Sequence, residues 1–313
     1  MSLTGHYWTV WPVLRDRRRA LPTLEAEPWS AHVEDPQTGP LRLTGRLAVN
    51  DPSTLLMIVH GLGGCVDSLY MTRAASVAED LGVSHLRVNL RGADRDSHDF
   101  YHAGLWGDLQ AALASPRLSQ FENIFVLGYS VGGHVVLKLG TETSDPRVRA
   151  VAAVCSPLEL ETTVRHFDEP WRRPYRDYVL RGLRDTYRAV ADRREVPIPV
   201  ERVMAATLLR EWDSLTVVPR FGFGTAENYY EEMSVGPRLR ELAVPALLVA
   251  AEGDPMVTAA SIRAGLGRAG QGHGLRAVFS PRGGHVGFPP DLDLDLGGGP
   301  GLESQVIGWL LEQ

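Results

Sequence analysis

The segment GYSVG at residues 128–132 fits the pattern G-x-S-x-G and places Ser130 between two glycines. The apolar run NIFVLG before it is typical of a buried strand, and GGHVVLKLG after it is typical of a helix. A tight turn between strand and helix requires these glycines, because side chains there would clash with neighbouring backbone. Such a turn exposes the serine hydroxyl at the carboxyl edge of a sheet, where α/β proteins bind ligands. We therefore predict that Ser130 is a nucleophile.

A serine nucleophile needs a base, and that base needs a carboxylate to orient it. In strand–turn–helix sites the acid and then the base follow the serine along the chain. Asp254 comes shortly after the apolar run VPALLVA, and we predict that it is the acid. Two alternatives stay open: Glu252 could serve if the loop bends differently, and Asp254 could merely cap the helix expected from residue 259.

A histidine follows the last strand-like run, LRAVFS. It is His285, in the glycine-rich segment RGGHVGF. From such a loop a histidine can face the serine, take its proton and return it to the leaving group. We predict that His285 is the base and that Asp254 holds its imidazole in the required tautomer.

A second glycine-rich segment, HGLGG at residues 60–64, follows the apolar run LLMIVH. Glycine-rich turns also bind phosphates, but G-x-G-x-x-G and the P-loop lysine pattern are absent, which disfavours a nucleotide site. In a hydrolase such a loop donates a backbone N–H to an oxyanion hole, together with the residue after the nucleophile. We predict that these donors are Leu62 and Val131, and that the His60 side chain orders the loop.

The sequence predicts no metal site and no cofactor. His98 and His102 have the i, i+4 spacing of zinc ligands, but the glutamate of H-E-x-x-H is missing and no third ligand is evident. Cys65 and Cys155 are too few for a disulfide framework, so we expect reduced thiols in a cytoplasmic protein.

The elements that position these residues alternate along the chain. Apolar runs predict strands at 55–60, 83–90, 123–128, 150–154, 244–251 and 275–279. Helical patterns lie at 70–81, 104–113, 132–141, 259–267 and 302–311. Continuous apolar strands alternating with helices predict an α/β fold, with a mostly parallel, doubly wound sheet covered on both faces.

The alternation stops between residues 157 and 240, where only helical patterns occur, for example at 176–194 and 200–212. Strand-like sequence resumes afterwards, which favours an insertion over a free-standing domain. Long insertions after a strand often cover the ligand crevice. We predict a helical cap at 157–240 on a core formed by 1–156 and 241–313, and expect its aromatic residues to frame an apolar acyl site.

Composition narrows the class of protein. The 313 residues are 44% hydrophobic and 22% charged, which excludes low-complexity disorder and a disulfide-stapled miniprotein. A net charge of −6 argues against a nucleic-acid partner, because no basic excess is available to neutralise phosphates. There is no signal-peptide pattern and no apolar run near the ~20 residues of a membrane span.

Several further motifs belong together. They are Asn89–Gly92, Tyr101–Gly104 with Asp108 and Leu109, Gly222-Phe223 with Tyr229-Tyr230, Gly284–Phe288, and a faint H-x-x-T-x-x-P formed by His6, Thr9 and Pro12. In this combination the chain resembles the α/β-hydrolase superfamily, in particular its abhydrolase subfamily of bacterial esterases and eukaryotic lipid hydrolases. Two positions depart from that pattern: Gly253 replaces the first of two usual aspartates, and Cys65 stands where serine is common.

The resemblance implies that Ser130, His285 and Asp254 hydrolyse a small-molecule carboxylic ester through an acyl-enzyme, without a cofactor. An acyltransferase or thioesterase would use the same three residues, so both alternatives stay open. A non-catalytic ligand-binding homologue is a third possibility, which the presence of all three residues disfavours. Haloalkane dehalogenase and epoxide hydrolase chemistries are disfavoured because they need aspartate at the position of Ser130.

Overall fold

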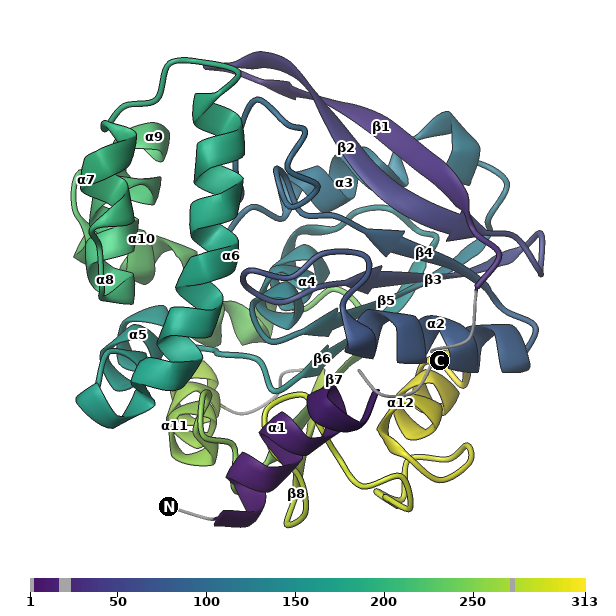
Figure 1. Ribbon diagram of the computed structural model, residues 1–313. Helices are drawn as coiled ribbons and strands as arrows, with labels where there is room; N and C mark the ends of the chain where they lie inside the picture. Colours follow the sequence, from purple (N-terminus) through teal and green to yellow (C-terminus); the bar gives the residue numbers. More distant parts are fainter. Residues whose placement is uncertain (1–2, 17–23, 271–273) are drawn as a thin grey trace.

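The computed structural model describes residues 3–16, 24–270 and 274–313. Its centre is an eight-stranded sheet in the order β1-β2-β4-β3-β5-β6-β7-β8, with helices on both faces (Figure 1). Neighbouring strands are parallel except at β1–β2 and β2–β4. The predicted α/β fold is confirmed. The strands are β1 (Glu27–Asp35), β2 (Gly39–Ala48), β3 (Thr54–Val59), β4 (Ser84–Val88), β5 (Asn123–Tyr129), β6 (Val148–Val154), β7 (Ala246–Ala251) and β8 (Leu275–Ser280).

The six strands predicted from continuous apolar runs are β3 to β8. In β3, β5, β6 and β7 the sequences are mostly apolar because successive side chains point to opposite faces and both faces are buried, whereas β8 at the edge of the sheet is only partly buried. In β3, Met57 and Val59 belong to one buried cluster, while Leu56 and Ile58 belong to the cluster on the other face.

The antiparallel hairpin β1–β2 was not among the predicted strands. Buried and exposed side chains alternate along both of its strands, with Trp29 and Ala31 buried in β1 and Leu41 and Leu43 buried in β2. A search for continuous apolar runs passes over such a strand, because alternation is the pattern of a sheet with one face toward water.

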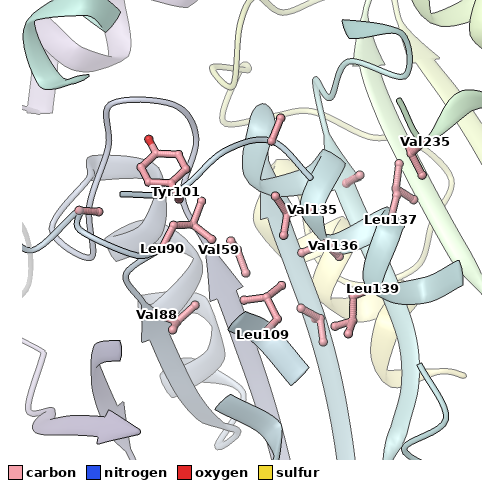
Figure 2. Packing of buried hydrophobic residues seen from close by; sticks show 14 of the residues in the cluster. Val59, Val88, Leu90, Tyr101, Leu109, Val135, Val136, Leu137, Leu139 and Val235 are labelled. Carbon is pink, nitrogen blue, oxygen red and sulfur yellow. The ribbon is translucent and has the colours of Figure 1, made fainter. Parts of the chain in front are cut away.

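Helices cover both faces of the sheet. The face that contains Leu56 packs against α2 (Leu69–Asp80) and α12 (Leu302–Leu311). The other face packs against α3 (Gly107–Leu113), α4 (Val131–Glu142) and α11 (Ala259–Ala269), and η1 (Pro116–Leu118) follows α3. Figure 2 shows part of this second cluster, including Val59 of β3, Val88 of β4, Leu109 of α3 and Val135 of α4, together with Tyr101.

The chain between β6 and β7 forms helices, which Figure 1 shows together on one side of the sheet in teal and green. The helix expected at 176–194 is present as α6. The prediction of one helix over 200–212 is wrong: the chain forms α7 and α8, separated by residues 205–208. The elements are α5 (Leu160–Phe167), η2 (Pro170–Arg172), α6 (Arg173–Ala191), α7 (Val200–Met204), α8 (Leu209–Leu215), α9 (Val217–Phe221), α10 (Ala226–Met233) and η3 (Gly236–Glu241).

A further helix that the sequence patterns did not predict, α1 (Leu3–Asp16), begins the described chain. It lies beside the loop that follows β8, since glycines of that loop approach the α1 backbone closely (Figure 1). Among the described residues, no helix is both long enough and apolar enough to cross a membrane.

Candidate active site

Ser130 occupies the turn between β5 and α4. Its backbone has φ 53° and ψ −124°, a conformation that costs a non-glycine residue about 1–3 kcal/mol and is typical of functional turns. The glycines beside it allow this turn. A Cβ atom at Gly128 would lie 2.5 Å from the carbonyl oxygen of Gly132, and one at Gly132 would overlap the backbone at His60. The serine side chain is half-buried and faces the edge where the parallel strands end.

The three residues predicted as nucleophile, base and acid form a continuous hydrogen-bonded chain. The Nε2 atom of His285 lies 3.0 Å from Ser130 Oγ, and its Nδ1 atom lies 2.9 Å from Asp254 Oδ2. A carboxylate only accepts hydrogen bonds, so Nδ1 carries the proton and Nε2 accepts from the serine hydroxyl. Both His285 and Asp254 are buried, which strengthens these interactions.

The Asp254 carboxylate is itself fixed by the loop after β7. Its Oδ1 atom accepts hydrogen bonds from the backbone amides of Met256 at 2.7 Å and Val257 at 3.0 Å, leaving Oδ2 for the histidine. The alternative acid, Glu252, points elsewhere and forms an exposed ion pair with Arg263. The geometry therefore favours Asp254 over Glu252.

The loop after β3 lies next to the serine turn because β3 and β5 are parallel neighbours, with Val59 opposite Gly128. Most amides of this loop are already engaged. Gly61 N–H donates to the Tyr70 hydroxyl at 3.0 Å, and Gly63 N–H donates to the Tyr101 hydroxyl at 2.7 Å. In the part of the chain that the structure describes, the amide of Leu62 donates to no other group.

The side chain of His60 fixes the peptide that carries this amide. Its Nε2 atom accepts a hydrogen bond from Leu90 N–H at 3.0 Å, so Nδ1 is protonated and donates to the Gly61 carbonyl at 2.8 Å. Burial away from water lowers the pKa of His60 to about 4, so the ring is neutral near pH 7. Because the Gly61 carbonyl is held on one side of the peptide, the Leu62 N–H points to the other.

Val131 is the first residue of α4, and the first amides of a helix have no intrahelical acceptor. Its N–H and that of Leu62 belong to neighbouring segments: a Cβ atom at Gly61 would lie 3.1 Å from the Cβ atom of Ser130. The positive end of the α4 dipole adds to the preference for negative charge at this point.

The pair His98 and His102 does not form a metal site. The two residues lie in irregular chain, with His98 exposed and His102 buried among the rings of Phe221, Phe223 and Tyr229. The Nδ1 atom of His102 accepts from the Gly104 amide, and burial lowers the pKa of the ring to about 3.

Among the described residues, the metal-ligating atoms of Cys155, Asp254 and His285 lie within 4.8 Å of one another. The histidine and aspartate atoms already bond to each other. Burial raises the pKa of the Cys155 thiol well above its ordinary value, so the soft thiolate ligand is disfavoured. The Cys155 Sγ atom instead lies 3.5 Å from the Gly284 carbonyl, in the loop that holds His285.

Segment 157–240 contacts both sides of the site. Gly182 of α6 packs on the loop after β3, where a Cβ atom would lie 2.5 Å from the Gly63 carbonyl. The buried Arg172 guanidinium donates to the carbonyl of Pro255, next to the predicted acid. These contacts place α6 and η2 directly over the loops that carry the candidate residues.

The sequence named Ser130, His285 and Asp254, and the fold brings them together. It named His60 only as ordering its loop and Tyr101 only as part of a motif, and it did not single out Tyr70. Their contacts join the loop after β3 to distant segments. A tyrosine hydroxyl that accepts one hydrogen bond from a distant backbone amide produces no periodic pattern in the sequence. The sequence alone therefore assigns these two tyrosines no role.

A mostly parallel sheet whose central strand runs through a sharp turn at a serine into a helix is the arrangement of α/β-hydrolase-fold proteins. The chain belongs to the alpha/beta hydrolase family, whose model matches residues 56–293.

The relatives that match this chain narrow its class within the family. YheT of Escherichia coli, whose name assigns it provisionally to the esterases, is 28% identical over 82% of this chain and 76% of its own length. The embryogenesis-associated protein EMB8 of Picea glauca is 25% identical over 95% of this chain and 66% of its own length. The monoacylglycerol lipase of Saccharomyces cerevisiae is 23% identical over 68% of this chain, which spans half of that lipase. The chain is therefore an esterase-like or lipase-like α/β hydrolase.

Solved structures agree on the fold. The esterase Pf2001 of Pyrococcus furiosus superposes with a TM-score of 0.54 at 15% identity, over 84% of this chain and 83% of that chain. A bacterial membrane phospholipase A superposes with a TM-score of 0.53 at 18% identity, over 89% of this chain and 85% of that chain. At such identities the likeness concerns the fold alone.

Proposed function

We propose that this protein hydrolyses carboxylic esters through an acyl-enzyme on Ser130. The observation that carries the proposal is the hydrogen-bonded chain Ser130–His285–Asp254 at the edge of the sheet, beside the unengaged amide of Leu62. No step of this reaction calls for a metal or an organic cofactor.

In the first half-reaction, Ser130 Oγ attacks the carbonyl carbon of the ester while its proton passes to His285 Nε2. The carbonyl oxygen becomes an oxyanion and accepts hydrogen bonds from the amides of Leu62 and Val131. The tetrahedral intermediate then collapses. The C–O bond to the alcohol breaks, and the alkoxide takes the proton from His285 and leaves as the alcohol.

In the second half-reaction, water attacks the acyl-enzyme carbonyl and gives its proton to His285. The new tetrahedral intermediate expels Ser130 Oγ, which recovers the proton, and the carboxylic acid departs. Asp254 stabilises the imidazolium in both halves and holds Nδ1–H toward itself, so that Nε2 faces the serine throughout.

The substrate class rests on the relatives and on segment 157–240. Yeast and human relatives are named monoacylglycerol lipases, which supports an ester with an apolar acyl group as substrate. We propose that residues 157–240 act as a cap over the site, supported by the contacts of α6 and η2 with its loops. The free thiols of Cys65 and Cys155 support a reducing compartment such as the cytoplasm.

The test is a panel of p-nitrophenyl esters, from acetate to palmitate, with wild type and Ser130→Ala compared at equal folded concentration. We expect wild-type turnover with at least one chain length and a loss of about 10⁶-fold in kcat for Ser130→Ala. Turnover that persists in Ser130→Ala would refute the proposal. Adding alcohol acceptors and thioesters to the panel distinguishes a hydrolase from an acyltransferase or thioesterase.

A further inference from the structure

Helix α1 differs from an ordinary surface helix, which turns its apolar side chains toward the protein and its polar ones toward water. The side that contacts the protein carries small or polar residues, Gly5, Thr9 and Pro12, at the i, i+4, i+7 spacing of one helix face. Five of its large apolar side chains are exposed, namely Leu3, Tyr7, Val10, Trp11 and Leu14, while Trp8 is half-buried. Burial of those five side chains does not hold α1 in place, so the contacts on its small-residue side are the main candidates for what fixes it.

Those contacts are with the loops that carry the proposed acid and base. A Cβ atom at Gly5 would overlap the backbone of Gly253, one residue before Asp254. A Cβ atom at Gly284 would overlap the Gly5 carbonyl, and one at Gly287 would overlap the Trp8 carbonyl. The backbone of α1 is therefore in close contact with other backbone at three points. These points lie in the loops that carry Asp254 and His285.

One side chain of α1 bonds directly to the base loop. The Thr9 hydroxyl accepts a hydrogen bond from the backbone N–H of His285 at 2.8 Å and donates to the Gly5 carbonyl at 2.7 Å. The loop around His285 has an unusual backbone, with φ 142° at Gly283 and φ 50° at Val286. A strained loop keeps one conformation only if its surroundings hold it there.

The N-terminal half of α1 also contacts segment 157–240. The Tyr175 hydroxyl of α6 lies 2.6 Å from His6 Nδ1, and the two rings stack with their centroids 5.7 Å apart. Helix α1 thus contacts both α6 and the loop after β8. These contacts fix the position of Thr9 relative to His285.

We propose that Thr9 is a positioning residue for the reaction, which acts by holding the backbone of His285 so that the imidazole reaches Ser130. This inference rests on the proposed function, because it needs His285 to be the base. A small displacement of a catalytic group costs up to about 10²-fold in rate, whereas substrate binding does not depend on the placement of the base. The effect therefore belongs to kcat rather than to KM.

The test compares Thr9→Val, Thr9→Cys and Thr9→Ser, with Thr4→Val as an exposed control on the same helix. Valine keeps the shape without an acceptor, cysteine offers a weak acceptor, and serine keeps the hydroxyl. Rates are measured per active site, titrated to completion with a fluorophosphonate, below the melting transition of each variant. We expect kcat to fall about tenfold in Thr9→Val, less in Thr9→Cys and under threefold in Thr9→Ser, with KM within twofold.

The inference is overturned if Thr9→Val keeps wild-type kcat. It is also overturned if kcat follows the melting temperature across the series, including Thr9→Ser and Thr4→Val, since that marks a purely structural role. If Thr9→Val does not fold, the ranking of Thr9→Cys below Thr9→Ser at comparable stability decides the question. A folded wild type that hydrolyses none of the p-nitrophenyl esters and takes no fluorophosphonate label would instead refute the proposed function, so the two failures are distinguishable.

Discussion

The imidazole of His285 lies within hydrogen-bond distance of both Ser130 and Asp254, one through each of its nitrogens. Asp254 is fixed by two backbone amides, so its orientation does not depend on the histidine. The proposed chemistry therefore concentrates on His285, whose replacement removes the proton carrier and leaves the neighbouring backbone in place.

We predict that His285→Ala lowers kcat by about 10⁶-fold, and that Asp254→Asn lowers it by about 10⁴-fold because the wrong tautomer is favoured. Steady-state hydrolysis of the best p-nitrophenyl ester measures both. Glu252→Gln is the matched control and should keep nearly full activity, since Glu252 pairs with Arg263 at the surface. Activity that survives in His285→Ala, or is lost in Glu252→Gln, would contradict the assignment.

The candidate residues could be named from sequence because each follows a strand-like run, Ser130 and His285 in glycine-rich segments and Asp254 in the segment AEGDP. Their supports could not. Thr9 contacts a backbone amide 276 positions later in the chain, and Tyr101 reaches Gly63 from a different loop. In Figure 2 the Tyr101 hydroxyl points away from the apolar cluster that buries its ring. Such contacts depend on the folded arrangement, and the surrounding sequence carries no local sign of them.

Among the elements, the helices at 160–241 are joined to the core by a buried ionic cluster. Arg220 of α9 donates to Asp99 at 2.6 and 2.8 Å and to Asp35 at 2.9 Å. Arg91 donates to the same two aspartates and to Asp108. The turn of the β1–β2 hairpin, the chain after β4 and α9 therefore meet at one buried point.

We predict that Arg220→Met destabilises the protein by about 3–5 kcal/mol, because the buried carboxylates of Asp35, Asp99 and Asp108 must then share Arg91 and lose the hydrogen bonds from Arg220. Urea unfolding at pH 7 measures the change. Arg173→Met is the control: it removes an exposed ion pair with Asp177 and should cost no more than about 1 kcal/mol. Equal effects of the two substitutions would show that the buried cluster adds nothing to stability.

A second element-scale prediction concerns Asp213 in α8, which is buried and accepts a hydrogen bond from the Tyr230 hydroxyl of α10 at 2.8 Å. Burial raises the pKa of Asp213 from 3.8 to about 7. The unfolded chain ionises this group first. Its contribution to stability is therefore full at low pH, declines as the pH rises from about 4 to about 7, and stays low above that.

Asp213→Asn should accordingly stabilise the protein at pH 8, by about 4 kcal/mol at most, and have little effect near pH 4. Thermal unfolding at several pH values measures this dependence. Asp177→Asn, an exposed substitution with the same change of charge, serves as the control. A stabilisation that is equal at both pH values would refute the role of ionisation.

The elements themselves were predictable to different degrees. Strands β3 to β8 were predictable because they are rich in apolar residues, which in β3, β5, β6 and β7 reflects burial on both faces. The hairpin β1–β2 and α1 were not, because the hairpin alternates and α1 exposes most of its large apolar side chains to solvent. The expected helix over 200–212 failed because residues 205–208 interrupt it.

For the molecule as a whole, the site lies where the strand order reverses, between β3 and β5, which is where open α/β sheets bind ligands. In the proposed site, the loop after β3 supplies one oxyanion amide, the turn after β5 the serine, and the loops after β7 and β8 the acid and the base. Helix α1 and segment 157–240 contact these loops from the outside. Segments far apart in the sequence therefore lie in contact around the proposed site.

The central claim is that Ser130 is a nucleophile activated by His285. Labelling with a fluorophosphonate probe, followed by mass spectrometry of the modified peptide, tests it most directly. The account predicts one adduct on Ser130 in wild type, none in Ser130→Ala, and strongly slowed labelling in His285→Ala. A folded wild type that stays unlabelled, or an adduct that persists in Ser130→Ala, would contradict it.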